Sequence, residues 1–265
     1  MSKTPMSLTY TSYLAIDELL GLQRPRSDPE EHDETLFIVI HQVYELWFKL
    51  ILHEVGKLND DLSAGRTFRG IETLKRIRMV LKILVAQLDV LETMSPMSFR
   101  SFRDRLEAAS GFQSVQFRAL EFALGHKREA MLRHHAENPA ALKELEGWLQ
   151  ARSTVDHFYD YLESQGEPVP SALRDKDVAE PTQPNEAIQD AVLRLYRTKP
   201  DVKVLLELMT DVDEGLQEWR YRHVKMVERT IGDQAGTGGS PGVAFLRKTL
   251  HQPVFPDLWA IRNRI

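Results

Sequence analysis

Two histidines within apolar sequence are the residues best suited to chemistry. His41 lies in the run FIVIHQVYELWFKLILHEV, residues 37 to 55, and His223 lies in a long helical pattern over residues 201 to 231. An imidazole in such surroundings can bind a metal or a haem iron, or exchange a proton near neutral pH. It can equally be a structural residue of a core, so both interpretations stay open at this point.

The spacing of apolar residues predicts that His223 points inward. Along residues 201 to 231 they step alternately by four and three, which is typical of a helix seam packed against neighbours. A seam between long helices is where helical bundles place cofactors. The seam consists of Leu205, Met209, Val212, Leu216, Trp219, His223 and Met226.

A polar stripe accompanies His41. Glu45, Lys49 and His53 follow it at intervals of four, so on a helix all four side chains share one face. The last three are interpreted as a solvated edge, with Glu45 and Lys49 as a supporting pair. The stripe also argues against a membrane span, which needs about 20 apolar residues with few charges.

A third candidate region combines an aromatic ring with an arginine. Within residues 97 to 122, Phe99 and Arg103 are four apart and share a helix face, and Ser110-Gly111 interrupts the chain before the next helix. Arginine's planar fork suits a carboxylate, and a neighbouring aromatic ring supplies an apolar wall. Arg103 could equally be a solvated surface residue.

A glycine-rich segment surrounds Thr237 in GDQAGTGGSPGVAFLRKTL. Glycines permit positive φ and a close approach of the backbone to a ligand. The Lys-Ser/Thr ending of a P-loop is missing and no strand precedes the segment, so a nucleotide fingerprint fails. The segment is either a mobile surface loop or a place where Thr237 hydrogen-bonds a small polar ligand.

Metal signatures and cysteine chemistry are absent from the sequence. There is no HExxH motif and no Glu-x-x-His pair of the di-iron type. Cysteine is lacking altogether, which excludes disulfides, iron–sulfur clusters, thiolate-ligated zinc or haem, and a cysteine nucleophile. If a metal is bound, one inward histidine per helix suits a haem better than a naked ion.

Composition indicates a globular protein. The 265 residues are 42% hydrophobic and 28% charged, with a formal net charge of −5 and no dense basic tract. Nothing therefore suggests nucleic-acid binding. The N-terminus has no signal-peptide pattern, and we expect a cytoplasmic location without a membrane partner.

Periodicity of about 3.6 dominates the chain and convincing strand patterns are missing, so we predict an all-α fold, a helical bundle with long core helices. The helices are expected near 7–21, 34–62, 67–93, 96–107, 112–124, 127–135, 138–150, 152–164, 186–197, 200–231 and 242–251.

The connections indicate one domain over residues 1–265. Residues 22 to 33 form a polar connection, and Asp33 is predicted as the N-cap of the first long helix. Residues 165 to 185 hold four prolines and are interpreted as a loop excursion from the helical body. No internal repeat is visible.

Four ordered blocks of sequence resemble the tryptophan 2,3-dioxygenase family of haem enzymes. They are LTYTSYLAIDELL, HDETLFIVIHQVYELWFKL, FRDRLEAASGFQSVQFRALEF and WRYRHVKMVERTIGDQAGTGGSPGVAFLRKTL. The resemblance implies that the long core helices enclose a haem b, ferrous in the active form, with His223 as the axial ligand of the iron. It places His41 on the distal side, near the indole N–H of the substrate.

The resemblance also implies a substrate pocket and a homotetramer. Arg103 would pair with the substrate carboxylate and Thr237 would hold its ammonium group. Tyr10 and Tyr13 resemble tyrosines that reach the pocket of a neighbouring subunit, so the N-terminal segment 1–21 would belong to a partner's site. The other pocket positions are Phe37, Phe99, Ser110 and Gly111.

Two positions depart from the family pattern. Pro241 stands where the family usually carries serine, and Phe99 stands where some members carry tyrosine. The polar pair Asp233-Gln234, which precedes the glycines, also varies in the family. The difference at Phe99 is mild, and variation at Asp233-Gln234 bears on the dynamics of the loop more than on the chemistry.

The implied reaction inserts both atoms of dioxygen across the pyrrole double bond of L-tryptophan. It gives N-formylkynurenine, the first step of tryptophan catabolism by the kynurenine pathway, and consumes no reductant. One alternative is a haem oxygenase on the same scaffold that inserts one oxygen into a different indole in secondary metabolism. Others are a non-catalytic haem or ligand sensor, and a helical scaffold with structural histidines.

Overall fold

The computed structural model describes residues 7–234, 236 and 242–265, and within them it contains helices and no strand, which confirms the all-α prediction. The α-helices are α1 (Tyr10–Leu14), α2 (Ile16–Leu20), α3 (His32–Ser63), α4 (Thr67–Leu91), α5 (Pro96–Arg103), α6 (Val115–Leu124), α7 (Pro139–Gln150), α8 (Thr154–Ser164), α9 (Ser171–Arg174), α10 (Glu186–Thr198), α11 (Pro200–Ile231), α12 (Val243–Arg247) and α13 (Pro256–Ala260). Short 3-10 turns are η1 (Asp104–Leu106), η2 (Gly111–Gln113), η3 (Glu129–His135) and η4 (Ile261–Arg264).

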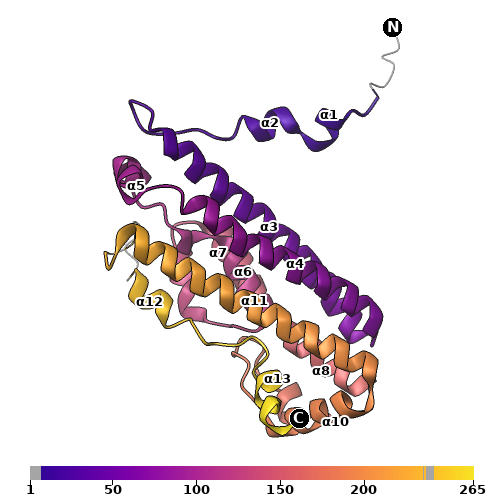
Figure 1. Ribbon diagram of the computed structural model, residues 1–265. Helices are drawn as coiled ribbons and strands as arrows, with labels where there is room; N and C mark the ends of the chain where they lie inside the picture. The colour runs from indigo at the N-terminus through magenta and orange to yellow at the C-terminus, as the bar shows by residue number, and fades with distance from the viewer. Residues whose placement is uncertain (1–6, 235, 237–241) are drawn as a thin grey trace.

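Three long helices, α3, α4 and α11, lie side by side and form the body of the molecule (Figure 1). The helices α5 and α12 lie at one end of this body, while α8, α10 and α13 lie at the other (Figure 1). One connected cluster of buried apolar side chains draws members from α3, α4, α5, α6, α8, α10, α11 and α13. This shared core supports our prediction of a single domain.

The buried face of α3 shows why this sequence forms a core helix. Its buried apolar residues recur at intervals of three and four, which aligns them along one side of the helix. The same pattern brings His41 and Glu45 to the edge of that face. The buried apolar positions are Ile40, Tyr44, Phe48, Ile51, Val55, Leu58 and Leu62.

The single helix predicted over residues 7–21 is wrong. Ala15 adopts a left-handed conformation (φ 50°, ψ 46°), which separates α1 from α2. No residue of either helix is buried, and both project away from the body (Figure 1). Without tertiary packing nothing offsets the low stability of such short helices.

The predicted N-cap of the first long helix is also wrong. Glu31 occupies the N-cap of α3, and Asp33 lies in the first turn, where a carboxylate complements the helix dipole. The preceding connection is held by Glu34, whose carboxylate accepts the backbone N–H groups of Arg26 at 2.7 Å and Ser27 at 2.9 Å.

Several other boundaries differ from the prediction. The α-helix expected over 96–107 ends at Arg103. The segment expected as a helix over 127–135 forms the 3-10 turn η3, and the helix expected over 242–251 is shortened to α12. The loop 165–185 contains the short α9, and α13 with η4 was not predicted. A segment of five residues is too short to display a 3.6-residue period.

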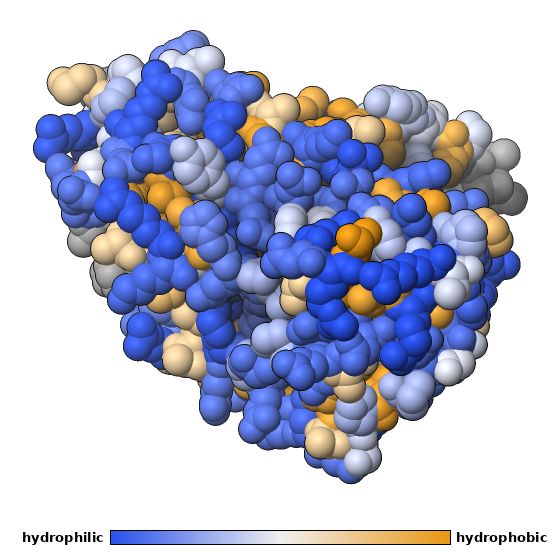
Figure 2. Space-filling model, turned by 60° about the horizontal axis from the view of Figure 1, so that its bottom comes forward, coloured by the Kyte–Doolittle hydropathy of each residue, from blue (hydrophilic) through white to orange (hydrophobic). Residues whose placement is uncertain are grey.

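By length and composition alone, α3 is apolar enough to cross a membrane, with a mean hydropathy of 1.4. A single helix of this kind is equally typical of the core of a soluble protein. One side of α3 packs in the core, although Val39 and Leu46 are exposed. The face seen in Figure 2 is covered mostly by hydrophilic residues. The polar stripe therefore does not exclude a span, and the absence of a membrane partner stays a prediction.

Asp213 fastens the C-terminal segment to α11. This fully buried carboxylate accepts the backbone N–H groups of Val254 at 3.0 Å and Phe255 at 2.9 Å, and the indole N–H of Trp259 at 2.9 Å. Hydrogen bonds to a charged acceptor are stronger than neutral ones. The carboxylate thus fixes a segment that lacks a long helix of its own.

An ion-pair network around Asp160, at the C-terminal end of α3, should make the stability of the fold sensitive to acid. Burial alone would raise the pKa of Asp160, but hydrogen bonds from Arg152, Ser63 and Arg174 outweigh it and lower the pKa to about 2 from 3.8. The difference corresponds to about 2 kcal/mol of folding free energy at neutral pH. Because the folded-state pKa is lowered, this contribution is present above about pH 4 and is lost as the pH falls toward 2.

We therefore expect Asp160→Asn to lower the free energy of unfolding by about 2 kcal/mol at pH 7. Urea unfolding of both proteins from pH 7 downward tests this. The difference between wild type and variant should shrink below pH 4. A difference that stays constant across the titration would show that Asp160 contributes through packing rather than charge.

Candidate active site

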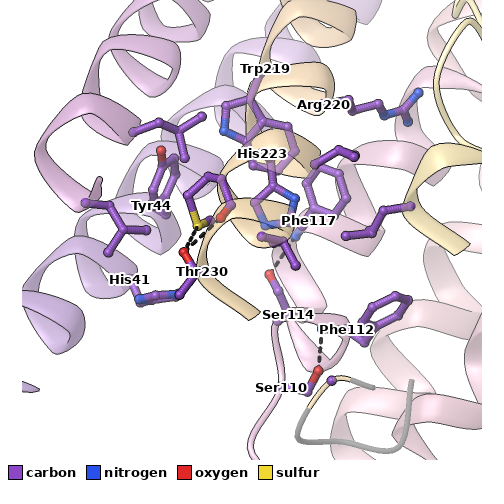
Figure 3. A pocket seen from close by; sticks show the side chains of 18 of the residues that line it. His41, Tyr44, Ser110, Phe112, Ser114, Phe117, Trp219, Arg220, His223 and Thr230 are labelled. Atoms are coloured by element: carbon purple, nitrogen blue, oxygen red, sulfur yellow. Dashed lines mark hydrogen bonds between the residues drawn. The ribbon is translucent and has the colours of Figure 1, made fainter. Parts of the chain in front are cut away.

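A cavity of about 280 Å³ lies between α3, α5, α6 and α11, and part of it is seen in Figure 3. Most positions singled out from the sequence line it, although they come from distant parts of the chain. Tyr10 and Tyr13 do not line it, and Thr237 lies outside the described residues. The predicted positions that meet there are Phe37, His41, Phe99, Arg103, Ser110, Gly111 and His223.

His223 presents a neutral imidazole to the cavity from α11. Its ring stacks on Trp219 with a centroid separation of 5.3 Å and an interplanar angle of 15°. Within the described part of the chain neither ring nitrogen has a hydrogen-bond partner. Burial, with a smaller effect of His41, lowers the pKa of His223 to about 4. The imidazole is therefore uncharged at neutral pH and has a lone pair available, as a metal ligand requires.

His41 enters the cavity from α3 with a defined tautomer. Its Nδ1 lies 2.7 Å from the carbonyl oxygen of Phe37, so Nδ1 carries the proton and donates it. Nε2 is then left as an acceptor. Burial lowers the pKa of His41, and the bond to Phe37 and the charge of Glu45 only partly oppose this. The ring keeps substantial accessible surface because it faces a hollow, while packed protein surrounds it on the other sides.

Three phenylalanines form an aromatic wall beside His41. The ring of Phe37 lies 4.1 Å from the His41 ring centroid, 5.7 Å from Phe99 and 5.6 Å from Phe102. Phe99 and Phe102 meet edge to face at 5.5 Å. Phe102 is fully buried, and its ring packs against the partly buried rings of Phe37 and Phe99 and fixes their positions. The tilted rings of this wall offer an apolar aromatic surface suited to an aromatic ligand.

Ser110 and Gly111 form the turn that leads into α6. The Ser110 hydroxyl accepts the backbone N–H of Phe112 at 3.4 Å (Figure 3). The Gln113 side chain accepts the Ser110 N–H at 3.2 Å. A Cβ on Gly111 would meet nothing within 4 Å, so packing against the protein does not require glycine there. The space next to Gly111 is open toward the cavity.

Arg103 lies at the end of α5, half-buried at the cavity's edge. Its guanidinium donates to the side-chain oxygen of Gln234 at 2.7 Å. Gln234 follows the end of α11, so this bond joins two elements that border the cavity. Arg103 is thus held with its charge at the cavity wall.

A buried charge cluster at the cavity was not predicted from the sequence. The carboxylate of Glu121 accepts hydrogen bonds from Arg118, from Arg128 at 2.8 Å and from Arg220 at 2.9 Å. Glu121, Arg118 and Arg220 are almost completely buried. Burial would raise the pKa of Glu121, but the three guanidinium groups outweigh it and hold the pKa below its usual value.

This arginine cluster carries more positive than negative charge. Three guanidinium groups face one carboxylate, an excess of two positive charges within the cluster. The Nε atoms of Arg118 and Arg128 are buried and have no hydrogen-bond partner among the described residues. Buried unpaired donors and charges are costly, so the cluster is suited to an anionic group in the cavity.

The C-terminal segment supports the arginine cluster from behind. His126 accepts a hydrogen bond from Arg220 at 3.1 Å through Nδ1 and donates from Nε2 to the carbonyl of Pro253 at 3.0 Å. Arg220 also donates to the carbonyl of Gln252 at 3.4 Å. The segment that Asp213 fastens to α11 therefore fixes the orientation of Arg220.

The donors of the cavity suit a haem better than a bare ion. Within the described residues no group of three or more His, Asp or Glu side chains could hold a metal ion. A haem brings its own four nitrogen donors and needs an imidazole from the protein, which His223 offers uncharged and without a hydrogen-bond partner among the described residues. Its two carboxylates would match the double positive excess of the arginine cluster. The residues present therefore fit this cofactor.

The fold and the cavity show a helical protein with a ligand site lined by two histidines. Comparison with known sequences identifies its family. The chain matches the family described as tryptophan 2,3-dioxygenase over residues 1–148 and 178–265. The protein belongs to this family, which confirms the resemblance drawn from the four sequence blocks.

Individual relatives in this family are similar to the protein along nearly its whole length. A protein named tryptophan 2,3-dioxygenase from Herpetosiphon aurantiacus is 56% identical over 97% of this chain and 98% of its own length. One of the same name from Anaeromyxobacter dehalogenans is 51% identical over 98% of this chain and 97% of its own. Another from Caulobacter vibrioides is 41% identical over 97% and 98%, respectively.

Sequence reasoning missed Arg118, Glu121 and Arg220 for a definable reason. Arg118 and Glu121 are three apart in VQFRALEFAL, a spacing also typical of an exposed ion pair. The available signal was that every other residue of that helix after Gln116 is apolar, which leaves no solvated face for the pair. Arg220 is 99 residues from Glu121, and no local pattern joins them.

Proposed function

We propose that this protein opens the pyrrole ring of L-tryptophan with dioxygen and forms N-formylkynurenine. The observation that carries the proposal is the cavity in which two uncharged histidines, an aromatic wall and Arg103 meet. The family to which the chain belongs supports the same activity. Product formation would begin tryptophan catabolism by the kynurenine route.

Haem b is the proposed cofactor. His223 would be its axial ligand, and the arginine cluster would hold its carboxylates. When bound in the ferrous form, haem would supply the activation of dioxygen, which protein side chains cannot provide. The chain's own residues bind and orient the indole and limit the access of water.

His41 is proposed to orient the indole. Its Nδ1–H is committed to the carbonyl of Phe37, so the free Nε2 can accept a hydrogen bond from the indole N–H. This bond would raise electron density in the ring and fix which edge faces the reacting oxygen. Phe37 and Phe99 would hold the ring plane by aromatic contacts.

Arg103 is proposed to bind the carboxylate of the amino acid. Its half-buried guanidinium at the cavity's edge offers a charged, planar donor, and such pairs fix both distance and angle. Ser110 and Gly111 would border the same ligand. The binding of the ammonium group by Thr237 stays a prediction from the family resemblance.

A haem mono-oxygenase acting on another indole is the alternative, and two observations disfavour it. The relatives are named dioxygenases, and Arg103 places a guanidinium suited to a carboxylate at the cavity's edge, which a free indole would not use. Oxygen consumption separates the two activities. Reduced, haem-loaded protein should consume one dioxygen per tryptophan over many turnovers without added reductant. Dependence of each turnover on a reductant would contradict ring-opening dioxygenation.

We also propose a homotetramer in which the N-terminal arm, residues 7–21, reaches the cavity of a neighbouring subunit. The arm buries none of its residues in its own chain, and Leu8, Tyr10, Tyr13 and Leu20 are at least 70% exposed. An apolar arm of this kind is suited to docking on a partner.

Deletion of residues 1–21 tests the arm. We expect the shortened protein to keep haem but to bind tryptophan more weakly and to form smaller oligomers, because the partner's Tyr10 and Tyr13 would be missing. Light scattering and tryptophan titration measure both. Unchanged oligomeric state and affinity would contradict the docking of the arm.

A cytoplasmic location without nucleic-acid partners stays a prediction from composition.

A further inference from the structure

The bond between Arg103 and Gln234 suggests a role for a residue outside the proposed binding set. The Arg103 guanidinium donates to the Gln234 side-chain oxygen at 2.7 Å, across 131 positions of sequence. Under the proposed function, the same guanidinium receives the carboxylate of the substrate. An amide oxygen presents an acceptor of the same kind as a carboxylate oxygen, but without the charge.

The backbone at the end of α11 sets the position of Gln234. The helix ends at Ile231, and Gly232 follows with φ 63°, a conformation that side-chain-bearing residues rarely adopt. The Gly232 N–H still donates to the carbonyl of Glu228 at 2.9 Å, and the Gln234 N–H donates to that of Ile231 at 3.4 Å. These bonds turn the chain back so that Gln234 is presented to α5.

We propose that Gln234 competes with the substrate carboxylate for Arg103 and thereby sets the affinity for amino-acid ligands. This inference rests on the proposed function, in which Arg103 binds that carboxylate. A charged acceptor bonds a guanidinium more strongly than a neutral one, so the substrate displaces Gln234 and the contact lowers affinity without blocking the site. The product retains the same carboxylate, so the competition also favours its release.

Ligands that differ only in the carboxylate reveal this competition. Under this proposal L-tryptophan replaces the bond from Arg103 Nη1 to Gln234, whereas tryptamine, which has the indole and the ammonium group alone, leaves that bond in place. Removing the amide by Gln234→Ala should therefore tighten L-tryptophan binding by about threefold to tenfold, the range expected for one hydrogen bond. Tryptamine binding should change by less than about twofold, since its bonding does not involve Arg103.

A carboxylate at the same position gives the opposite result. Gln234→Glu places a charged competitor against Arg103 and should weaken L-tryptophan binding by about threefold to tenfold. Its added charge should leave the affinity for the cationic tryptamine unchanged or higher. Asp233→Ala is the matched control, because no hydrogen bond or ion pair of the Asp233 side chain occurs among the residues that the structure describes.

Calorimetric titration of haem-loaded protein without dioxygen measures these affinities without turnover. Opposite shifts for Gln234→Ala and Gln234→Glu, seen with L-tryptophan and not with tryptamine, would establish the competition. If Gln234→Ala weakens L-tryptophan binding, leaves it unchanged, or affects both ligands equally, the competition is refuted. Failure of the wild-type protein to bind L-tryptophan at all would instead refute the proposed function, and the inference with it.

Discussion

His223→Ala is expected to purify without stably bound haem. The His223 imidazole is uncharged, has no hydrogen-bond partner among the described residues and faces the cavity. Loss of the axial ligand would leave only the arginine cluster and apolar contacts to hold the cofactor. Haem titration followed by absorption should show an affinity at least about 100-fold lower, since the loss of a residue that only orients a ligand already costs up to about that much in metal sites.

Two controls make this result specific. His53→Ala removes an exposed histidine of α3 that does not line the cavity and should leave haem binding unchanged. Free imidazole added to the His223→Ala protein should restore the absorption spectrum of a nitrogen-ligated haem, because the truncated side chain leaves room for it. A variant that keeps the wild-type spectrum and affinity would move the axial ligand to another residue.

Arg103→Ala is expected to weaken L-tryptophan binding by about 100-fold while haem is retained. Removal of one partner of a charged hydrogen-bonded pair typically costs about 2–5 kcal/mol, and partial exposure of Arg103 places the effect toward the lower end. Titration of the haem-loaded protein without dioxygen gives the dissociation constant. Tryptamine, which lacks the carboxylate, should bind wild type and variant about equally.

Arg100→Ala is the control for this substitution. Arg100 is three residues earlier on α5, is exposed and does not line the cavity. Its removal changes the local charge by the same amount, so any long-range electrostatic effect would appear in both variants. Equal losses for the two variants, or normal saturation with Arg103→Ala, would remove Arg103 from the binding site.

The long helices were predictable because their signal is repeated many times. The observed α3, α4 and α11 agree with the predicted ranges to within two residues at each end. Each presents an apolar face over many turns, and the inward position of His223 follows from that same period. Position within a periodic helix is therefore enough to find a candidate ligand, although it does not reveal what the residue binds.

Short elements and distant contacts were not predictable in the same way. The break at Ala15 depends on the lack of packing around α1 and α2, which no local pattern reports. The residues of the arginine cluster come from α6, from α11 and from Arg128, which precedes η3. Their charges form one site only when the fold brings these elements together. The Arg103–Gln234 bond is of the same kind.

The most direct test of the proposed function is the mass of the product formed from L-tryptophan in isotopically labelled dioxygen. The reaction would use haem-loaded, ferrous protein with no added reductase. A product that carries two labelled oxygen atoms is the predicted result, because both atoms would be inserted across the pyrrole bond. Unchanged tryptophan, or a product with one labelled atom that forms only when reductant is supplied, would contradict the account.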